Sequence, residues 1–288
     1  MKKITIISGK GGTGKTTIVS NLAALAENLV LADCDVDAPN MHLLLKPAVK
    51  EDNVFMSAKL AVRDEDRCIK CGKCREVCRF NAIKPDLEIN PIKCDGCGVC
   101  VAMCPEDALR LEEQETGRIF RSETEFGPMI HAYLKAGAEN SGKLVSEVRD
   151  LSDEVAVKAG KELVLIDGSP GIGCPVVASL KGVDYTMIVT EPTLSGLSDL
   201  KRILELTALF NITTFVVINK YDLNEEISRE IENYCSERSI EVIGRVSFSS
   251  VINQSLREGS LLFESAPESK AANEIRLVWE TLTGHLFN

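Results

Sequence analysis

The chain has 288 residues and a formal net charge of −10, from 33 basic and 43 acidic side chains, which argues against nucleic acid or an anionic membrane surface as the main partner. Hydrophobic residues make up 44% of the sequence, the first apolar run ends at Ser8, and no later run is long enough to cross a bilayer. We therefore expect a cytoplasmic protein with room for one large α/β domain and a smaller one.

The first predicted strand, at residues 4–7, leads into a glycine-rich loop with the sequence GKGGTGKTT at residues 9–17. An apolar strand, a G-x-x-x-x-G-K-T loop and a helical pattern in this order are typical of a phosphate-binding loop. A glycine-rich turn without a ligand is the alternative, and the matching flanks disfavour it. The glycines let backbone N–H groups surround phosphates, and the helix directs its positive end at them. The expected nucleotide-binding residues are Gly11, Gly12, Thr13, Gly14, Lys15, Thr16 and Thr17.

Three side chains of this loop have expected roles in catalysis. Lys15 is placed to reach the β- and γ-phosphates, and the Thr16 hydroxyl to bind Mg²⁺. Lys10, directly after the first glycine, makes the loop resemble the deviant Walker loop of the MinD/Mrp group, which includes the ParA ATPases and the nitrogenase iron protein. The resemblance implies that Lys10 reaches the phosphates of a partner subunit, where its charge would stabilise the transition state. A solvated loop lysine is the alternative.

A second buried strand, predicted at residues 29–32, delivers Asp33, Asp35 and Asp37 at its C-terminal end. In an open α/β sheet the ligand lies outside that end of the strands. The segment resembles the first switch of the MinD/Mrp group, and the resemblance implies that Asp35 orients or activates the attacking water. We expect Asp33 to be a Mg²⁺ ligand and leave Asp37 open, since the carboxylates could also act through water or be solvated. Cys34 between them is expected to be a small buried hydrophobe.

Eight of the eleven cysteines form two runs of identical spacing, C-x2-C-x2-C-x3-C, between Cys68 and Cys104. This spacing is typical of bacterial ferredoxins, in which the fourth cysteine of each run ligates the other cluster. Zinc bound by C-x2-C pairs is the alternative, and two complete runs disfavour it. We expect two [4Fe–4S] clusters, the first held by Cys68, Cys71, Cys74 and Cys104 and the second by Cys94, Cys97, Cys100 and Cys78.

The first cysteine run departs from the ferredoxin pattern. Arg79 follows its fourth cysteine, where the second run has Pro105. With Lys70, Lys73 and Arg75, it makes the first run locally basic. The positive charge could favour a reduced cluster or form a docking face for an acidic redox partner, and the sequence does not decide between these hypotheses.

Beyond the cysteine runs, an apolar strand predicted at residues 163–166 ends in Asp167, which we expect to hold a water on Mg²⁺. The glycine-rich segment that follows resembles the second switch of the group, and the resemblance implies that the Gly171 N–H senses the γ-phosphate. Cys174, just beyond this segment, is expected to have no cluster role. Further strands are predicted at residues 185–189 and 213–218.

The C-terminal part of the sequence supplies the base contact and a last helix. A helix is predicted near residues 198–210, and Asn219 follows the next strand. The resemblance implies that Asn219 contacts adenine, which favours ATP over GTP. A helix predicted at residues 268–282 mixes acidic with basic residues, so we expect it to dock on the core and not on a membrane. The spacing of the three histidines is not typical of metal ligands. They are His42, His131 and His285.

These features predict an α/β fold, a doubly wound and mostly parallel sheet of the P-loop NTPase type, at residues 1–58 and 114–288. A bacterial-ferredoxin-like α+β domain is inserted at residues 59–113. The sequence resembles, over its full length, MinD-like ATPases that carry an inserted ferredoxin. This resemblance implies a homodimeric ATPase that delivers electrons to a metalloenzyme or to metallocofactor maturation. The alternatives are a cluster carrier and a redox-sensing positioning ATPase; because one chain supplies all eight ligands, permanent clusters are favoured.

Overall fold

The computed structural model describes residues 1–287, which divide into two compact units. The larger unit contains Met1–Asp52, Ile119–Tyr133 and the chain from Ser141 onward. The second, here called the cysteine unit, contains Asn53–Arg118 and Leu134–Asn140. The insert predicted at residues 59–113 lies inside the cysteine unit, whose bounds are wider because the strands that flank the cysteine runs are long.

Nine strands form one sheet in the described part of the chain, in the order β3-β4-β5-β2-β6-β1-β7-β8-β9. The neighbours β1–β6, β1–β7, β2–β5, β2–β6, β7–β8 and β8–β9 are parallel, which confirms the mostly parallel sheet. The strands are β1 (Lys2–Ser8), β2 (Leu29–Asp33), β3 (Ala48–Arg63), β4 (Leu109–Thr124), β5 (Gly127–Leu134), β6 (Leu163–Pro170), β7 (Tyr185–Thr190), β8 (Thr213–Asn219) and β9 (Glu241–Val246).

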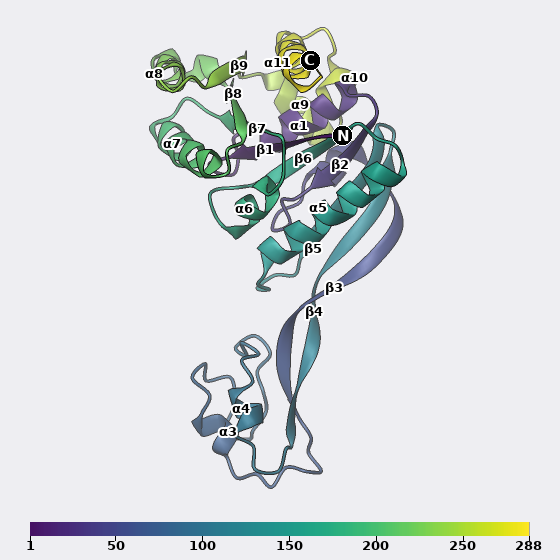
Figure 1. Cartoon of the computed structure of the whole chain (residues 1–288), viewed down its shortest axis with the longest axis vertical. Helices are drawn as coiled ribbons and strands as arrows, with labels where there is room; N and C mark the ends of the chain where they lie inside the picture. The colour runs from purple at the N-terminus through teal and green to yellow at the C-terminus, as the bar shows by residue number, and fades with distance from the viewer. Residues whose placement is uncertain (288) are drawn as a thin grey trace. The chain divides into compact units, whose positions relative to one another are not determined.

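Most of the helices belong to the larger unit, whereas the short helices α3 and α4 lie side by side in the cysteine unit (Figure 1). No helix within residues 1–287 has the length and hydropathy that a bilayer span requires. The helices are α1 (Lys15–Leu25), α2 (Met41–Leu45), α3 (Lys73–Glu76), α4 (Val99–Ala102), α5 (Ser141–Lys158), α6 (Cys174–Leu180), α7 (Leu194–Leu209), α8 (Glu225–Ser236), α9 (Ser250–Glu258), α10 (Leu262–Ser265) and α11 (Lys270–Leu286), with a 3₁₀ turn at Tyr221–Leu223.

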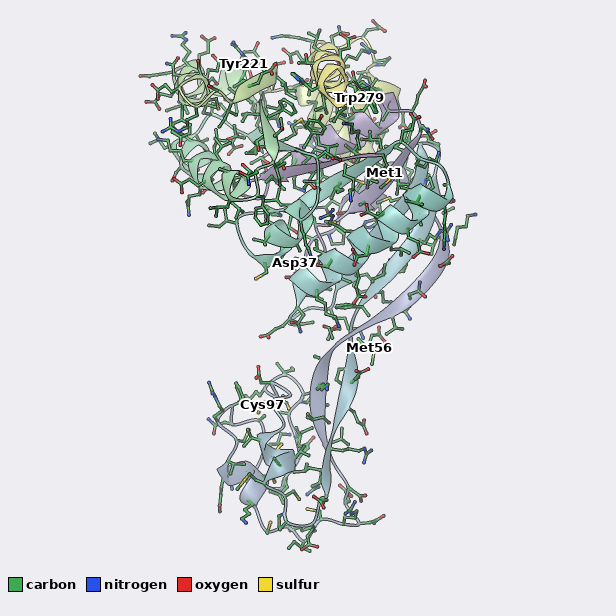
Figure 2. All side chains as sticks on the ribbon, viewed as in Figure 1. Met1, Asp37, Met56, Cys97, Tyr221 and Trp279 are labelled. Atoms are coloured by element: carbon green, nitrogen blue, oxygen red, sulfur yellow. The ribbon has the colours of Figure 1, made fainter. Side chains whose placement is uncertain are left out.

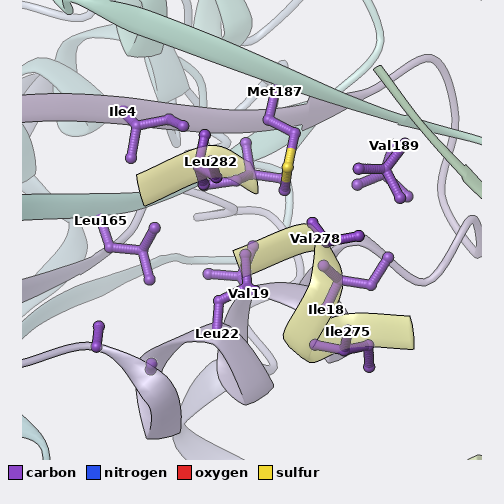
Figure 3. Packing of buried hydrophobic residues seen from close by; sticks show 14 of the residues in the cluster. Ile4, Ile18, Val19, Leu22, Leu165, Met187, Val189, Ile275, Val278 and Leu282 are labelled. Atoms are coloured by element: carbon purple, nitrogen blue, oxygen red, sulfur yellow. The ribbon is translucent and has the colours of Figure 1, made fainter. Parts of the chain in front are cut away.

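The central strands are apolar on both faces because helices cover both faces. On one side, Ile4, Leu165 and Met187 of the strands pack against α1 and α11, as Figure 3 shows. On the other side, Ile7 and Ile188 pack against α6, α7 and α8. Successive side chains of a strand point to opposite faces, so strands buried on both sides are continuously hydrophobic. This arrangement confirms the doubly wound interpretation.

The first helix begins differently from several later helices. A side-chain oxygen caps the first turn of α7, α8, α9 and α11 and accepts a backbone N–H. Before α1 stands Gly14, which has no side chain to cap the helix and a left-handed φ of 88°. The start of α1 therefore keeps its N–H groups available for an anion, as a phosphate site requires.

The predicted strands are confirmed as β1, β2, β6, β7 and β8, and two predicted helices differ in extent. Helix α7 begins at Leu194, not at residue 198, because the Thr193 hydroxyl accepts a hydrogen bond from Gly196 N. Helix α11 continues to Leu286, past the predicted end at residue 282, because Leu286 is buried in the core. Both differences arise from contacts that a local sequence pattern does not contain.

Candidate functional site

A pocket of the larger unit lies at the C-terminal ends of β1, β2 and β6. It is lined by the glycine-rich loop, by the segment that contains Asp35, and by Ser169 and Pro170 of β6. Adjacent parallel strands bring these loops together: Asp33 of β2 lies in register with Asp167 of β6, and Ile6 of β1 pairs with the same residue. This is the sheet edge at which an open α/β fold binds its ligands.

Two glycines of the loop are required by close approach. A Cβ on Gly14 would lie 2.3 Å from Asn219 Nδ2, and a Cβ on Gly9 would lie 2.2 Å from Asp199 Cβ. Both contacts are too short for any side chain, so the loop has its present course only with glycine at these positions. Asn219 and α7, far along the chain, thereby fix the conformation of the glycine-rich loop.

Lys15 is buried among carboxylates at the centre of this pocket. Its Nζ lies 2.5 Å from Asp167 Oδ1 and 3.6 Å from Asp35 Oδ2. Desolvation opposes its charge, but the attraction of Asp167 and Asp35 outweighs this and raises the pKa of Lys15. The lysine is therefore a fixed positive charge at the start of α1, where phosphate would bind.

Three carboxylates face this single lysine, so the pocket has an excess of acid. Asp33 is fully buried and accepts hydrogen bonds from Asp35 N at 3.1 Å and from Met41 N at 3.3 Å. Burial, reinforced by the charge of Asp167, raises the pKa of Asp33 to about 8. Burial likewise raises the pKa of Asp35 to about 6. A site with this composition would be stabilised by a cation.

The oxygen donors fit a magnesium ion. Thr16 Oγ1 donates to Asp167 Oδ2 at 2.7 Å, so the predicted hydroxyl ligand and the predicted strand-end acid meet directly. Hydroxyl and carboxylate oxygens are the donors that Mg²⁺ prefers. Asp33 lies beside them, held by two backbone N–H groups. Asp37 is exposed at the end of the same segment (Figure 2).

The two segments that resemble the switches of the MinD/Mrp group are hydrogen-bonded to each other and to the strand that precedes the glycine-rich loop. Ser169 Oγ donates to the Cys34 carbonyl at 2.7 Å and so links the two segments. Gly171, with φ of 94°, donates its N–H to Ser8 O at 2.8 Å. That N–H must leave Ser8 before it can bind a phosphate. Cys34 is buried as expected, and burial raises its pKa, whereas Cys174 is exposed at the start of α6.

The side chain of Lys10 is 35% exposed and contacts residues of its own chain. Its Nζ lies 2.8 Å from Glu191 Oε1 and donates to Ser195 Oγ at 2.9 Å. Glu191 also pairs at 3.1 Å with Lys220, which donates to the Gly12 carbonyl at 3.0 Å. Partial burial opposes the charge of Glu191, but hydrogen bonds from the two lysines keep its pKa below the usual range. The role of Glu191 shows no signal in the sequence, because its contact with Lys10 depends on β7 lying beside β1.

Asn219, the predicted base contact, holds the glycine-rich loop in this structure. Its Nδ2 donates to the Thr13 carbonyl at 2.6 Å, and its Oδ1 accepts from Lys220 N at 3.0 Å. The amide therefore holds the loop from the end of β8. Its contact with adenine stays a prediction.

The cysteines of the second unit surround two cavities. Cys68, Cys71, Cys74 and Cys104 line one, and Cys78, Cys94, Cys97 and Cys100 line the other. Each cavity takes three cysteines from one run and the fourth from the other run. Figure 2 shows Cys97 in this unit. Within residues 1–287, no three His, Cys, Asp or Glu side chains are grouped as ligands of a single metal ion.

The two cavities resemble each other in detail. The fourth cysteine of each run accepts a backbone hydrogen bond from four residues further on: Cys78 Sγ from Ala82 N at 3.4 Å, and Cys104 Sγ from Ala108 N at 3.3 Å. Apart from sulfur, the walls are largely apolar. Four thiols, apolar walls and N–H donors to sulfur fit an iron–sulfur cluster. The role of the cysteines as cluster ligands stays a prediction.

The chain is similar to nucleotide-binding proteins over most of its length. The family model described as "CobQ/CobB/MinD/ParA nucleotide binding domain" matches residues 4–262. Protein MJ0578 of Methanocaldococcus jannaschii is 38% identical over 226 residues, which are 77% of this chain and 79% of the relative. Over a shorter stretch of 52 residues, 18% of this chain and 64% of the relative, the chain is 36% identical to the pyruvate synthase component PorD of Methanothermobacter marburgensis.

A solved structure agrees with the fold described above. The septum site-determining protein MinD of Pyrococcus horikoshii, complexed with Mg-ADP, has a TM-score of 0.60 and 18% identity. The alignment covers 99% of this chain and 98% of that chain. At this identity the likeness shows the fold alone.

The buried lysine gives the first testable prediction. Lys15→Ala should abolish nucleotide binding, because the phosphates lose the one cation buried in the pocket. Lys10→Ala is the matched control, since Lys10 is engaged by Glu191 at the rim, and it should keep the nucleotide affinity of the parent within about threefold. Calorimetric titration of each variant with an ATP analogue and Mg²⁺ measures this. An equal loss of affinity in both variants would contradict the different positions of the two lysines.

Proposed function

The chain belongs to the CobQ/CobB/MinD/ParA family of nucleotide-binding domains, and from that premise we propose that it is a homodimeric ATPase that couples ATP binding and hydrolysis to electron transfer through two [4Fe–4S] clusters. The clusters would serve a metalloenzyme or the maturation of a metallocofactor. One observation carries the proposal: each of two cavities is lined by four cysteines, in the crossed sets of a two-cluster ferredoxin.

The nucleotide side of the proposal rests on the charges of the pocket. Lys15 and the N–H groups at the start of α1 would bind the phosphates, and Thr16 with Asp167 would hold Mg²⁺, Asp33 lying beside them. When bound, Mg²⁺ would neutralise the excess of carboxylate charge and the charge that develops on the phosphates. Asp35, half-buried next to Lys15, would orient the attacking water. The complex of a MinD with Mg-ADP supports adenine as the base.

Lys10 has two possible partners in the proposed cycle. In this structure it is paired with Glu191 of its own chain. In a nucleotide-bound dimer it would leave Glu191 and contact the phosphates of the partner subunit, where its charge stabilises the transition state. Lys220, already hydrogen-bonded to Glu191, would then neutralise the released carboxylate.

The electron-transfer part of the proposal rests on the number of cysteine ligands that one chain provides. One chain provides four thiols to each cavity, so a cluster in either cavity would be complete without a second subunit. When bound, the clusters would supply one-electron chemistry at low potential. The chain's own contributions are the apolar walls and the N–H donors to Cys78 and Cys104. A cluster carrier would more typically hold a labile cluster at a subunit interface, so electron transfer is the better supported function.

Two variants test the hydrolytic roles together. Asp35→Asn should keep ATP bound but slow hydrolysis by roughly two orders of magnitude, because the water loses its orienting carboxylate. The ATP-bound dimer should then accumulate in size-exclusion chromatography, and adding Lys10→Ala should remove that dimer. Asp37→Asn tests the rival carboxylate, because Asp37 lines the same pocket but is exposed, and we expect it to affect the rate much less than Asp35→Asn. If Asp37→Asn slows hydrolysis and Asp35→Asn does not, the assignment of the water-orienting residue is wrong.

The crossed ligand sets predict which cysteine variants should change the same EPR signal. Protein purified without oxygen should contain about eight iron and eight sulfide per chain. Cys104→Ser should change the same EPR signal as Cys71→Ser, since the two sulfurs line one cavity, and Cys78→Ser should change the same signal as Cys97→Ser. Iron and sulfide analysis with EPR of the reduced protein measures this. A zinc-replete chain without broad visible absorbance would refute the clusters, and variants that group by run would refute the crossing.

A further inference from the structure

The two cysteine runs differ sharply in charge. Between the first cysteine of the first run and the residue after its fourth, there are four basic residues and one acidic residue. The same stretch of the second run has one acidic residue, Asp95, and no basic residue. The cavities follow this pattern in part: Arg63, Lys70 and Glu106 line the first, whereas Asp95 is the one charged residue that lines the second. Of the two runs, the first therefore has the positive charge.

The basic side chains of the first run are also left without partners. Lys70, Lys73 and Arg75 are exposed, and none of them forms an ion pair with any residue in 1–287. Several other basic residues of the cysteine unit are paired: Arg63 with Glu65, Lys84 with Glu88, Arg110 with Glu112 and Lys135 with Glu115. Lys59, Arg79 and Lys93 are exposed and form no ion pair within residues 1–287, but they are spread over the unit and not gathered in one turn. Glu76 and Asp86 line the same surface pocket as Lys70 and Arg75 but are not paired with them. Lys70, Lys73 and Arg75 are therefore free to pair with a partner.

Equivalent turns of the two runs face different surroundings. Lys70 and Gly96 occupy the same position in their runs, and both are left-handed, with φ of 54° and 65°. A Cβ at Gly96 would lie 2.2 Å from the Lys59 carbonyl of β3, so that turn is covered by a strand. Gly72 of the first run has no atom within 4 Å of an added Cβ, whereas its equivalent Gly98 faces Leu111 of β4. The first run is thus open where the second is packed.

An apolar residue stands among the free charges. Ile69, between Cys68 and Lys70, is 62% exposed. An exposed aliphatic residue with cations around it has the composition of a small interface with an apolar centre and a charged rim. Weak electron-transfer complexes have small interfaces, which bury less than about 1,200 Å² in total.

We propose that this first-run face, defined by Ile69, Lys70, Lys73 and Arg75, docks a small acidic electron-carrier protein beside the first cavity. The proposal rests on the proposed electron-transfer function and adds the class of partner and its point of contact. Charge complementarity selects an acidic partner, because the rim offers three cations without ion pairs. It also selects this face, because the chain as a whole has a charge of −10 and repels an acidic protein elsewhere. A nucleic acid would need a longer track of cations than one turn provides.

The test measures binding and not turnover. Iron-loaded protein, handled without oxygen, is titrated with a purified acidic ferredoxin at about 0.02 M and about 0.3 M salt. The parent should bind at low salt and release the ferredoxin at high salt. The triple variant Lys70→Glu, Lys73→Glu, Arg75→Glu should bind at least roughly tenfold more weakly, because rim charges set such encounters. The matched control Lys50→Glu, Lys181→Glu, Arg257→Glu makes the same change in net charge at exposed sites elsewhere and should stay within about threefold of the parent.

Iron analysis of each protein separates the possible failures. If the Glu variant loses iron, the triple variant Lys70→Gln, Lys73→Gln, Arg75→Gln replaces it and should also weaken binding. Equal weakening in the control, or an iron-loaded parent that does not bind the ferredoxin, would overturn the docking face and leave the proposed function standing. A parent chain without iron would overturn both. Tighter binding of a short DNA duplex than of the ferredoxin, lost in the same variant, would overturn the protein partner in favour of nucleic acid.

Discussion

The buried ion pair between Lys15 and Asp167, with Nζ and Oδ1 2.5 Å apart, is the interaction on which the nucleotide site depends. The strand order β2-β6-β1 makes this ion pair possible. It places the acids at the ends of β2 and β6 next to helix α1, which follows β1. One lysine does not neutralise Asp33, Asp35 and Asp167 together. The pocket is therefore arranged for phosphates bound together with a divalent cation, since the phosphates match the lysine and the cation matches the acids.

A second constraint of the same kind organises the cysteine unit. Each cavity needs the fourth cysteine of the other run, so neither run can form its site alone. The repeat is reproduced in the backbone, where Ala82 and Ala108 each donate to the sulfur of a fourth cysteine. The runs differ in their outer turns, because Lys59 of β3 and Leu111 of β4 cover the turn of the second run, whereas no atom covers Gly72 in the turn of the first. One unit thus has two similar centres with different access.

The parts of the site that depend on local sequence could be predicted. The glycine-rich loop and the acids at the strand ends follow from spacing, because each belongs to one turn or one strand end. The crossed cysteine sets follow from the pattern of two-cluster ferredoxins and not from a single turn. Glu191 and its contact with Lys10 could not be predicted, since the pair forms only when β7 lies beside β1. The stacking of His42 on His131, with ring centroids 6.0 Å apart, could not be predicted either. The two histidines come from segments far apart in the sequence, and their spacing shows no pattern. The exact ends of helices α7 and α11 could not be predicted either, because the Thr193 cap and the burial of Leu286 determine them.

The central claim is that nucleotide binding and the redox state of the cysteine unit are linked, and a potentiometric titration followed by EPR tests it most directly. Iron-loaded protein is titrated with and without a non-hydrolysable ATP analogue, with Lys15→Ala as the control that should not bind nucleotide. If the analogue binds the reduced form tenfold more tightly, the one-electron midpoint rises by about 59 mV, because the two equilibria are linked. We predict a shifted midpoint in the parent and none in Lys15→Ala. An unchanged midpoint and unchanged spectra in iron-loaded parent protein saturated with the analogue would contradict the account.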